Sequence, residues 1–334
     1  MNPRKVTSAV LPVVRAGASW QSQLLSLGLR TAVKPMLHAW SYVPGTLWPS
    51  QTIDLLARRL PIPQGTTVRS IALPDCPAEW VEHEDAEPDR AILYLHGGAF
   101  LCCGLNSHRR LVARISDAAG AGVLHVGYRM MPRNTINHAV ADALEGYRWL
   151  LAHGYRGEDV VIAGDSAGGY LAFMTALEAL DADLPRPAGV VALSPLADMD
   201  PAGKRVHANA HRCPVFTLRA VEALTDLADR VETRFAVDGV SPQRRSPVDA
   251  DLVGHPPTLI QVGSQEMLLA DAELMASRLV AAGVECELQV WERQVHVFQA
   301  ASWVPEARAA VDEVGEFVKV ATAAAATEVH AHAG

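Results

Sequence analysis

The feature that most constrains the fold of this chain is the run Gly164-Asp-Ser-Ala-Gly-Gly169, which contains its only G-x-S-x-G sequence. An apolar run at 159–163 predicts a strand directly before it, and 167–180 predicts a helix directly after it. Glycines two residues before and two after the serine leave room for a sharp turn, because side chains there would collide with it. The pattern therefore predicts a strand–turn–helix unit that lifts the hydroxyl of Ser166 above the edge of a sheet. The alternative is an ordinary tight turn with a serine on the surface.

Strands alternate with helices through most of the chain from residue 66 onward. Short apolar or alternating runs predict further strands at 68–73, 79–82, 91–95, 122–127, 189–193, 257–262 and 284–291. Periodic apolar positions predict further helices at 136–151, 271–281 and 305–321. The first two strands are expected to form a hairpin. The repeated strand–helix–strand units predict an α/β fold, with a mostly parallel central sheet covered by helices on both faces.

Two segments fall outside this alternation. Residues 1–62 carry irregular helical signals at 20–34 and 53–60, and residues 201–247 are polar and charged, with a helix predicted at 218–234. We expect both segments to be additions that cover one end of the sheet. The alanine-rich end, 321–334, is expected to fray.

Charge and composition narrow the possible partners. The 334 residues include 29 Lys and Arg against 37 Asp and Glu, a formal charge of −8, which argues against a nucleic-acid partner. No stretch reaches the ~18 consecutive apolar residues of a membrane-spanning helix. The apolar run 6–14 is weak as a secretion signal, because Thr7, Ser8 and Pro12 interrupt it. The five cysteines are odd in number and form no C-x-x-C spacing, so we expect reduced thiols in a cytoplasmic protein.

A pair of glycines follows the strand at 91–95, in His96-Gly-Gly-Ala-Phe100. Adjacent glycines let backbone N–H groups point into a cavity without side chains in the way. Acyl transfer needs such donors where the carbonyl oxygen becomes negative, and removing one donor costs roughly 2.7–4 kcal/mol. We expect the N–H groups of Gly97, Gly98 and Ala167 to form this oxyanion hole. Taken alone, the glycine pair could equally be structural.

A nucleophilic serine needs a general base, and histidine has a suitable pKa. In proteins with a serine at such a turn, the acid and then the histidine follow it in the chain. After the strand at 257–262 the histidines are His296, His330 and His332, and the last two lie in the tail. His296, in the loop before the closing helix, is therefore the expected base.

The acid that orients this histidine should follow the strand at 257–262. Glu266 lies in the loop after that strand, whereas Asp271 begins the next helix. A carboxylate in the first turn of a helix is explained by the helix dipole alone. We therefore expect Glu266 to be the acid and keep Asp271 as the alternative.

Together, the motifs HGGAF, GDSAGG, GSQEMLLAD and VHVF resemble those of the bacterial hormone-sensitive-lipase-like carboxylesterases of the α/β-hydrolase superfamily, over about 91–298. The resemblance implies an α/β-hydrolase fold in which 1–62 form N-terminal cap helices and 63–334 form the catalytic domain, with 201–247 inserted as a further part of the cap. It also implies a serine carboxylic-ester hydrolase that acts through an acyl-enzyme on short or medium acyl esters. The family's nucleophile, acid and base fall on Ser166, Glu266 and His296, and its oxyanion donors fall on Gly97, Gly98 and Ala167.

The sequence departs from the pattern of this family at three places. Ala99 stands where a third glycine is commoner, a variant that the family tolerates, and the acid is Glu where many members have Asp. In the stretch Tyr128-Arg129-Met-Met-Pro132, the residue after proline is Arg133 instead of the usual acidic one. This last difference puts a local salt bridge in doubt, while the chemistry is unaffected.

The resemblance leaves several alternatives open. The nearest are a lactone hydrolase and a deacetylase of a small metabolite; the more remote are an acyltransferase and a ligand-binding receptor, which would lack a complete triad. We expect a small ester or lactone as partner, with no nucleic acid and no integral membrane, and a monomer or homodimer by analogy.

No cofactor and no metal are expected. The glycine motifs that cradle nucleotide phosphates are missing, and no acidic or thiol ligand completes the pair His207 and His211. Cys102 and Cys103 are expected to pack under the oxyanion loop or to line the acyl pocket.

Overall fold

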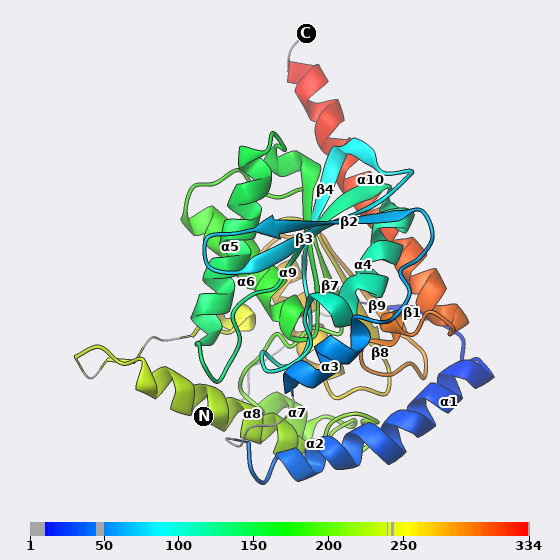
Figure 1. The fold of residues 1–334 in the computed structure, drawn as a ribbon, viewed down its shortest axis with the longest axis vertical. Coiled ribbons are helices and arrows are strands. Elements are labelled where there is room, and N and C mark those ends of the chain that lie inside the picture. The colour runs from blue at the N-terminus through cyan, green and yellow to red at the C-terminus, as the bar shows by residue number, and fades with distance from the viewer. Residues whose placement is uncertain (1–10, 45–49, 239, 242–243, 333–334) are drawn as a thin grey trace.

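The computed structural model describes residues 11–44, 50–238, 240–241 and 244–332. Within them, nine strands form one sheet in the order β1-β9-β8-β7-β6-β4-β5-β3-β2 (Figure 1). Neighbouring strands are parallel except at β3, which runs antiparallel to both β5 and β2. The strands are β1 (Val13–Arg15), β2 (Thr66–Ala72), β3 (Pro77–His83), β4 (Glu87–Leu95), β5 (Ala121–Val126), β6 (Val160–Asp165), β7 (Gly189–Leu193), β8 (Thr258–Gly263) and β9 (Cys286–Trp291).

Helices cover both faces of the sheet (Figure 1). In strand β4, alternate side chains point to opposite faces, so Leu93 and Leu95 join one buried cluster while Ile92 and Tyr94 join the other. Strands that are buried on both faces give continuous apolar runs, which is why the sequence predicted them. The helices on one face are α4 (Leu105–Ala119) and α10 (Pro305–His332); those on the other are α5 (Ile136–Ala152), α6 (Ala167–Asp181) and α9 (Leu269–Ala281).

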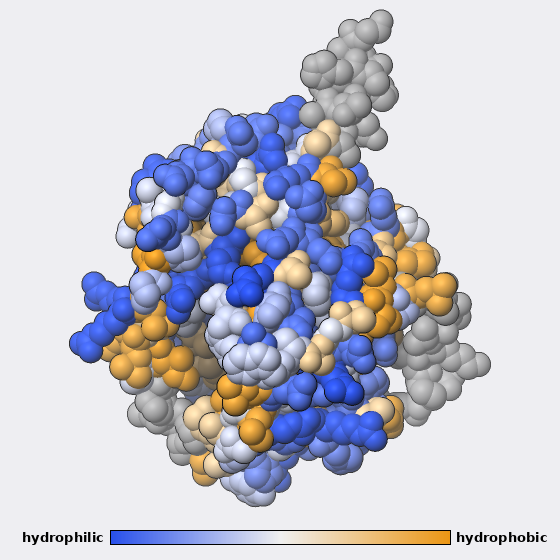
Figure 2. Space-filling model, turned by 90° about the vertical axis from the view of Figure 1, so that its right-hand side faces the viewer, coloured by the Kyte–Doolittle hydropathy of each residue, from blue (hydrophilic) through white to orange (hydrophobic). Residues whose placement is uncertain are grey.

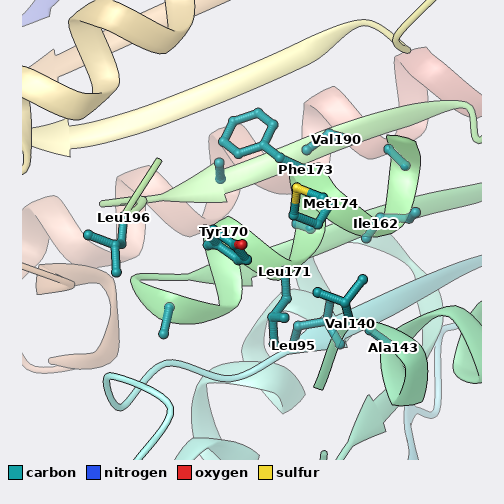
Figure 3. Packing of buried hydrophobic residues seen from close by; sticks show 14 of the residues in the cluster. Leu95, Val140, Ala143, Ile162, Tyr170, Leu171, Phe173, Met174, Val190 and Leu196 are labelled. Atoms are coloured by element: carbon teal, nitrogen blue, oxygen red, sulfur yellow. The ribbon is translucent and has the colours of Figure 1, made fainter. Parts of the chain in front are cut away.

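Helix α6 is packed on nearly every side. Figure 3 shows its side chains Tyr170, Leu171 and Phe173 among residues of β4, β6, β7 and α5. A helix that is apolar all round is stable only inside a core. Because α6 begins at Ala167, this burial fixes the position of the turn that carries Ser166.

The two segments outside the alternation pack together near the end of the sheet at which the parallel strands finish (Figure 1). Leu29, Val33 and Leu37 of the first segment contact a cluster that contains Cys213 and Val221 of the second. Their elements are α1 (Trp20–Gly28), a π-helical turn (Leu29–Val33), α2 (Lys34–Trp40), α3 (Ser50–Ala57), α7 (Ala202–Val206) and α8 (Leu218–Arg234). Short 3₁₀ turns occupy Gly157–Asp159, Pro247–Asp249 and Phe298–Ala300.

The predicted α/β architecture and the hairpin of β2 and β3 are confirmed. Some elements differ from the prediction: α4 and α7 are helices in stretches to which the sequence pattern assigned none, β1 adds a strand beside β9, and α10 continues to His332. Helix α10 runs through the alanine-rich end because alanine is the best helix former, and the fraying expected from 321 onward stays a prediction.

Some of the sequence predictions concern residues outside the described ranges. The apolar run 6–14 lies mostly there, as do the first ten residues of the proposed N-terminal cap and part of the turn before α3. Among the described helices, none combines the length and the apolar character needed to cross a bilayer.

Candidate active site

Ser166 occupies the turn between β6 and α6, with φ 54° and ψ −116°. Such backbone angles cost a non-glycine residue of order 1–3 kcal/mol and persist only where the surrounding structure imposes them. A Cβ atom on Gly164 would lie 2.2 Å from the carbonyl oxygen of Gly168, and one on Gly168 would lie 1.9 Å from that of Leu95. The two glycines are therefore required by the close approach of β4, β6 and α6.

Ser166, His296 and Glu266 come together at the carboxyl ends of β6, β9 and β8. The Oγ atom of Ser166 lies 3.0 Å from Nε2 of His296, and Nδ1 of His296 lies 2.7 Å from Oε2 of Glu266. A carboxylate can only accept, so Nδ1–H donates to Glu266 and Nε2 is left to accept the hydroxyl proton of Ser166. This arrangement lets the imidazole remove the serine proton.

Glu266 is fully buried, and its second oxygen is held by two donors. Oε1 accepts hydrogen bonds from the hydroxyl of Ser194 at 2.8 Å and from the N–H of Gly263 at 2.6 Å. The hydroxyl of Ser194 also accepts the N–H of Val297, next to the histidine, at 3.0 Å. Ser194 thus joins the loop of the acid to the loop of the base. The sequence analysis missed it, although its place directly after β7 was a signal.

Asp271, the alternative acid, does not contact His296. Its Oδ1 lies 2.8 Å from Nζ of Lys204, and its Oδ2 accepts the N–H groups of Ala197 and Asp198, each at 3.0 Å. Burial raises the pKa of Asp271, an effect that Lys204 opposes. Both carboxylate oxygens of Asp271 are therefore bonded to other groups, and neither is available to orient His296.

The loop after β4 presents free N–H groups to Ser166. Gly98 has φ +118° and Ala99 has φ +55°. Within the described part of the chain, the N–H groups of Gly98, Ala99 and Ala167 make no hydrogen bond. Ala99 and Ser166 line the same cavity, and Ala167 begins a helix whose first N–H groups have no intrahelical acceptor. These three groups can receive a negative oxygen beside Ser166.

The predicted donor at Gly97 is wrong for this geometry. Its N–H donates to Oδ1 of Asp165 at 3.0 Å, so it is not available to a substrate. A Cβ on Gly97 would lie 2.2 Å from Oδ2 of the same carboxylate. Gly97 therefore lets the oxyanion loop rest against Asp165, and the donors are provided by the residues that follow it.

Asp165 is a buried anion held by three donors. Besides Gly97, it accepts the hydroxyl of Tyr94 at 2.8 Å, and its Oδ2 lies 3.3 Å from Nε2 of His108. Burial would raise the pKa of Asp165, but the charge and hydrogen bond of His108 and the hydrogen bond of Tyr94 lower it. Burial alone would lower the pKa of His108, but the charge and hydrogen bond of Asp165 raise it to about 9. The sequence analysis missed this ion pair, because His108 lies on the unpredicted helix α4.

The cavity beside Ser166 is small and apolar, with a volume of about 60 Å³. Its walls come from the oxyanion loop, from α2 and from the segment 216–224 of the insertion, and Phe216 also packs edge-on against the ring of His296. Apart from Ser166, every lining residue is apolar: Leu37, Trp40, Ala99, Leu196, Phe216, Ala220, Val221, Leu224 and Leu268. Such a pocket suits a short hydrocarbon chain attached at the serine.

The remaining candidates of the sequence analysis lie away from this cavity. His207 and His211 lie in turns after α7, and no group of described residues could hold a metal ion. The thiols of Cys102 and Cys103 are 3.8 Å apart, and Cys103 lines a separate pocket behind the oxyanion loop. All five cysteines are free thiols.

Arg133 stands where the family pattern has an acidic residue, and its side chain is exposed. The local salt bridges are made by Arg129 instead. The guanidinium of Arg129 lies 2.7 Å from a carboxylate oxygen of Asp142 and 3.0 Å from one of Asp75. The side chains of His330 and His332 lie outside what the structure describes.

Comparisons with known proteins agree with this geometry. A family model described as an α/β hydrolase fold matches residues 92–300. The chain is similar to esterase LipU of Mycobacterium tuberculosis, with 44% identity over 297 residues that cover 87% of this chain and 99% of that protein. It is also similar to an acetyl-hydrolase of Streptomyces hygroscopicus, with 39% identity over 272 residues that cover 79% of this chain and 85% of that protein.

A solved structure extends the similarity to three dimensions. The crystal structure of an esterase from the bacterial hormone-sensitive lipase family has a TM-score of 0.79 and 31% sequence identity, and the match covers 92% of this chain and 100% of that one. The chain therefore belongs to the α/β-hydrolase fold family and, within it, to the hormone-sensitive-lipase-like carboxylesterases.

Proposed function

We propose that this enzyme hydrolyses carboxylic esters with short acyl groups through an acyl-enzyme on Ser166. The observation that carries the proposal is the continuous relay from Glu266 through His296 to Ser166, which opens on a small apolar cavity. A buried carboxylate, an imidazole and a hydroxyl in this order form the arrangement that serine acyl-transfer enzymes share on unrelated folds.

In the acylation step, Nε2 of His296 takes the proton of Ser166 while Oγ attacks the carbonyl carbon of the ester. The carbonyl oxygen becomes negative and faces the N–H groups of Gly98, Ala99 and Ala167. Glu266 keeps the ring in the required tautomer and stabilises the imidazolium. The imidazolium then protonates the alcohol oxygen as the bond to the acyl carbon breaks, and the alcohol leaves.

Deacylation repeats these steps with water as the nucleophile. His296 takes a proton from the water, the hydroxide attacks the acyl carbon, and the same N–H groups hold the second oxyanion. Collapse of this intermediate returns the proton to Oγ of Ser166 and releases the carboxylic acid.

The size of the cavity favours short acyl groups. A volume of about 60 Å³ accommodates only a few heavy atoms, since a water needs roughly 10–15 Å³ measured in the same way. The relative named as an acetyl-hydrolase supports a small acyl group as well. Hydrolysis of a lactone or of an acetylated metabolite remains the second candidate, because both would present a small carbonyl to Ser166.

We further propose that residues 1–62 and the insertion 201–247 form a cap over a catalytic domain. Support comes from the cavity, whose walls include Leu37 and Trp40 from the first segment and Phe216, Val221 and Leu224 from the second. A cytoplasmic location remains a prediction, and the free thiols of all five cysteines suit it.

The proposal is tested with p-nitrophenyl esters from acetate to palmitate, several lactones, and added alcohols. We expect the highest kcat/KM between acetate and butyrate. We expect Ser166→Ala to lower kcat by about six orders of magnitude, while the matched change at the exposed Ser70, Ser70→Ala, leaves it unaltered. Full turnover by Ser166→Ala would refute the nucleophile, and ester products formed from the alcohols would indicate acyl transfer.

A further inference from the structure

The first two helices form one rod whose outer side is apolar. Helix α1, the π-helical turn and α2 follow one another without a break from Trp20 to Trp40, a length of about 30 Å at ~1.5 Å per residue. On the outer side, Trp20 is 69% exposed, Leu24 54% and Leu27 57%. These positions are spaced by four and three residues, so they form a single stripe along the helix.

The inner side of the rod is already used for packing. Ser22 and Ser26 are buried, Leu25 and Leu29 contact the cluster around Trp291, and Leu37 lines the cavity beside Ser166. The helix therefore packs on the fold through its inner side, and the apolar residues of the outer stripe remain exposed to solvent. Figure 1 shows α1 and α2 at the lower edge of the molecule, and Figure 2, which faces the α1 side, shows exposed apolar side chains in orange at its lower end.

Charge separates this part of the chain from the rest. The rod carries Arg30 and Lys34 and no acidic residue, whereas the nearby Arg15 is already paired with Glu313. On the rod itself, Arg30 is exposed beside the apolar stripe. A helix with exposed Trp and Leu on one side and only positive charge is typical of segments that lie in the surface of an anionic lipid layer.

We propose that the outer side of this rod, residues 20–40, docks the enzyme on an anionic lipid surface. The stripe enters the boundary between headgroups and acyl chains, with Trp20 at headgroup level and Arg30 among the anionic headgroups. A second copy of the chain fits this face less well, because a twofold interface would bring the same basic residues opposite one another.

Docking would place the lipid surface against the same rod that encloses the acyl cavity. Leu37 and Trp40 line the pocket next to Ser166, and they lie one and four residues after the exposed Met36. Esters that partition into the lipid surface would then be concentrated near the cap. This inference goes beyond the proposed hydrolysis, and its test does not require turnover.

The test is flotation of the full chain with vesicles, carried out with the Ser166→Ala variant so that no lipid is hydrolysed. One set of vesicles is phosphatidylcholine alone and the other contains phosphatidylglycerol as well. We expect binding to the anionic vesicles, weakened at about 1 M salt, where the Debye length falls to about 3 Å. Arg30→Gln should weaken this binding by about fivefold, in line with the contribution of one basic residue near an anionic surface.

The apolar stripe is tested by the triple change Trp20→Ser, Leu24→Ser and Leu27→Ser. The matched control carries Val253→Ser, Val280→Ser and Val320→Ser, three exposed apolar residues before β8, near the end of α9 and in the middle of α10. We expect the stripe variant to lose binding by at least roughly tenfold, and the control to bind as before. Each triple change is also made in the enzyme that retains Ser166. We expect both of these variants to hydrolyse p-nitrophenyl acetate in solution at the rate of the unchanged enzyme, which shows that they are folded.

The proposal is overturned if the chain does not bind anionic vesicles, or if the stripe variant and the control bind them to the same extent in the flotation assay. It is also overturned if sedimentation shows a dimer that the stripe variant dissociates, because the face is then covered by a second copy.

Discussion

The ion pair of His108 and Asp165 predicts a dependence of stability on pH that can be measured directly. The pair lies under the oxyanion loop, where Asp165 also holds the N–H of Gly97. The side chain of His108 is 11% exposed and that of Asp165 is 2% exposed, so solvent screens the pair little. The perturbation is His108→Gln, which keeps a hydrogen-bond donor near Asp165 and removes the positive charge.

The magnitude follows from the pKa of His108, which Asp165 raises from the ordinary value of 6.5 to about 9 in spite of burial. A difference of this size corresponds to about 3 kcal/mol of stability. Because the folded-state pKa is the higher one, this stability is fully present below about pH 6.5 and is lost as the pH rises through about 9. Asp165 stays ionised in this range, since His108 and Tyr94 lower its pKa.

The assay is unfolding in urea at about pH 6 and about pH 10, for the wild type and for His108→Gln. The free energy of unfolding lost through the substitution should be larger at the lower pH by about 3 kcal/mol. Titrating groups that do not interact with His108 cancel in this difference. In an Asp165→Asn background most of this pH dependence should disappear, because the group that raises the pKa of His108 most strongly is gone. An equal cost at both values in the wild-type background would refute the reasoning.

Two further predictions concern the cavity and the two carboxylates. Trp40→Ala removes a wall of the cavity, so the ratio of kcat/KM for p-nitrophenyl octanoate to that for the acetate should rise by about tenfold; an unchanged ratio would show that Trp40 does not limit acyl length. Glu266→Gln should lower kcat on the order of 10⁴-fold. Asp271→Asn should leave kcat nearly intact but lower the free energy of unfolding by about 3–5 kcal/mol, because Lys204 stays buried without its anion. If Glu266→Gln leaves kcat unchanged and Asp271→Asn lowers it, Asp271 is the acid of the relay.

Most of the fold could be predicted because its strands are buried on both faces. In β6, β7 and β8 every residue is buried, so each strand is a mostly apolar run. Helix α4 does carry an amphipathic pattern, with Leu111, Ile115 and Ala119 buried at a spacing of four residues and Gly120 ending the helix, and the sequence analysis overlooked it. Strand β1 has only three residues, too few for a periodic pattern.

The site shows a similar limit. The glycines around Ser166 were predictable because they follow from steric contacts within one turn. Gly97 and Gly98 look alike in the sequence, and nothing local tells which N–H is free. The answer depends on Asp165, whose side chain takes the N–H of Gly97 from a neighbouring strand. Ser194 and His108 were missed for the same reason, since each acts on a residue more than fifty positions away.

The two carboxylates after β8 show how tertiary contacts assign chemistry to residues that a sequence can barely separate. Helix electrostatics explained Asp271 as a residue of the first turn of α9, yet its oxygens bond to Lys204 of α7 and to the backbone at 197–198. A buried lysine needs an anion, so Asp271 ties α7, where the insertion begins, to the sheet. The insertion supplies Phe216 and Leu224 to the cavity, so the carboxylate that takes no part in the relay helps to hold the wall against which the acyl group rests.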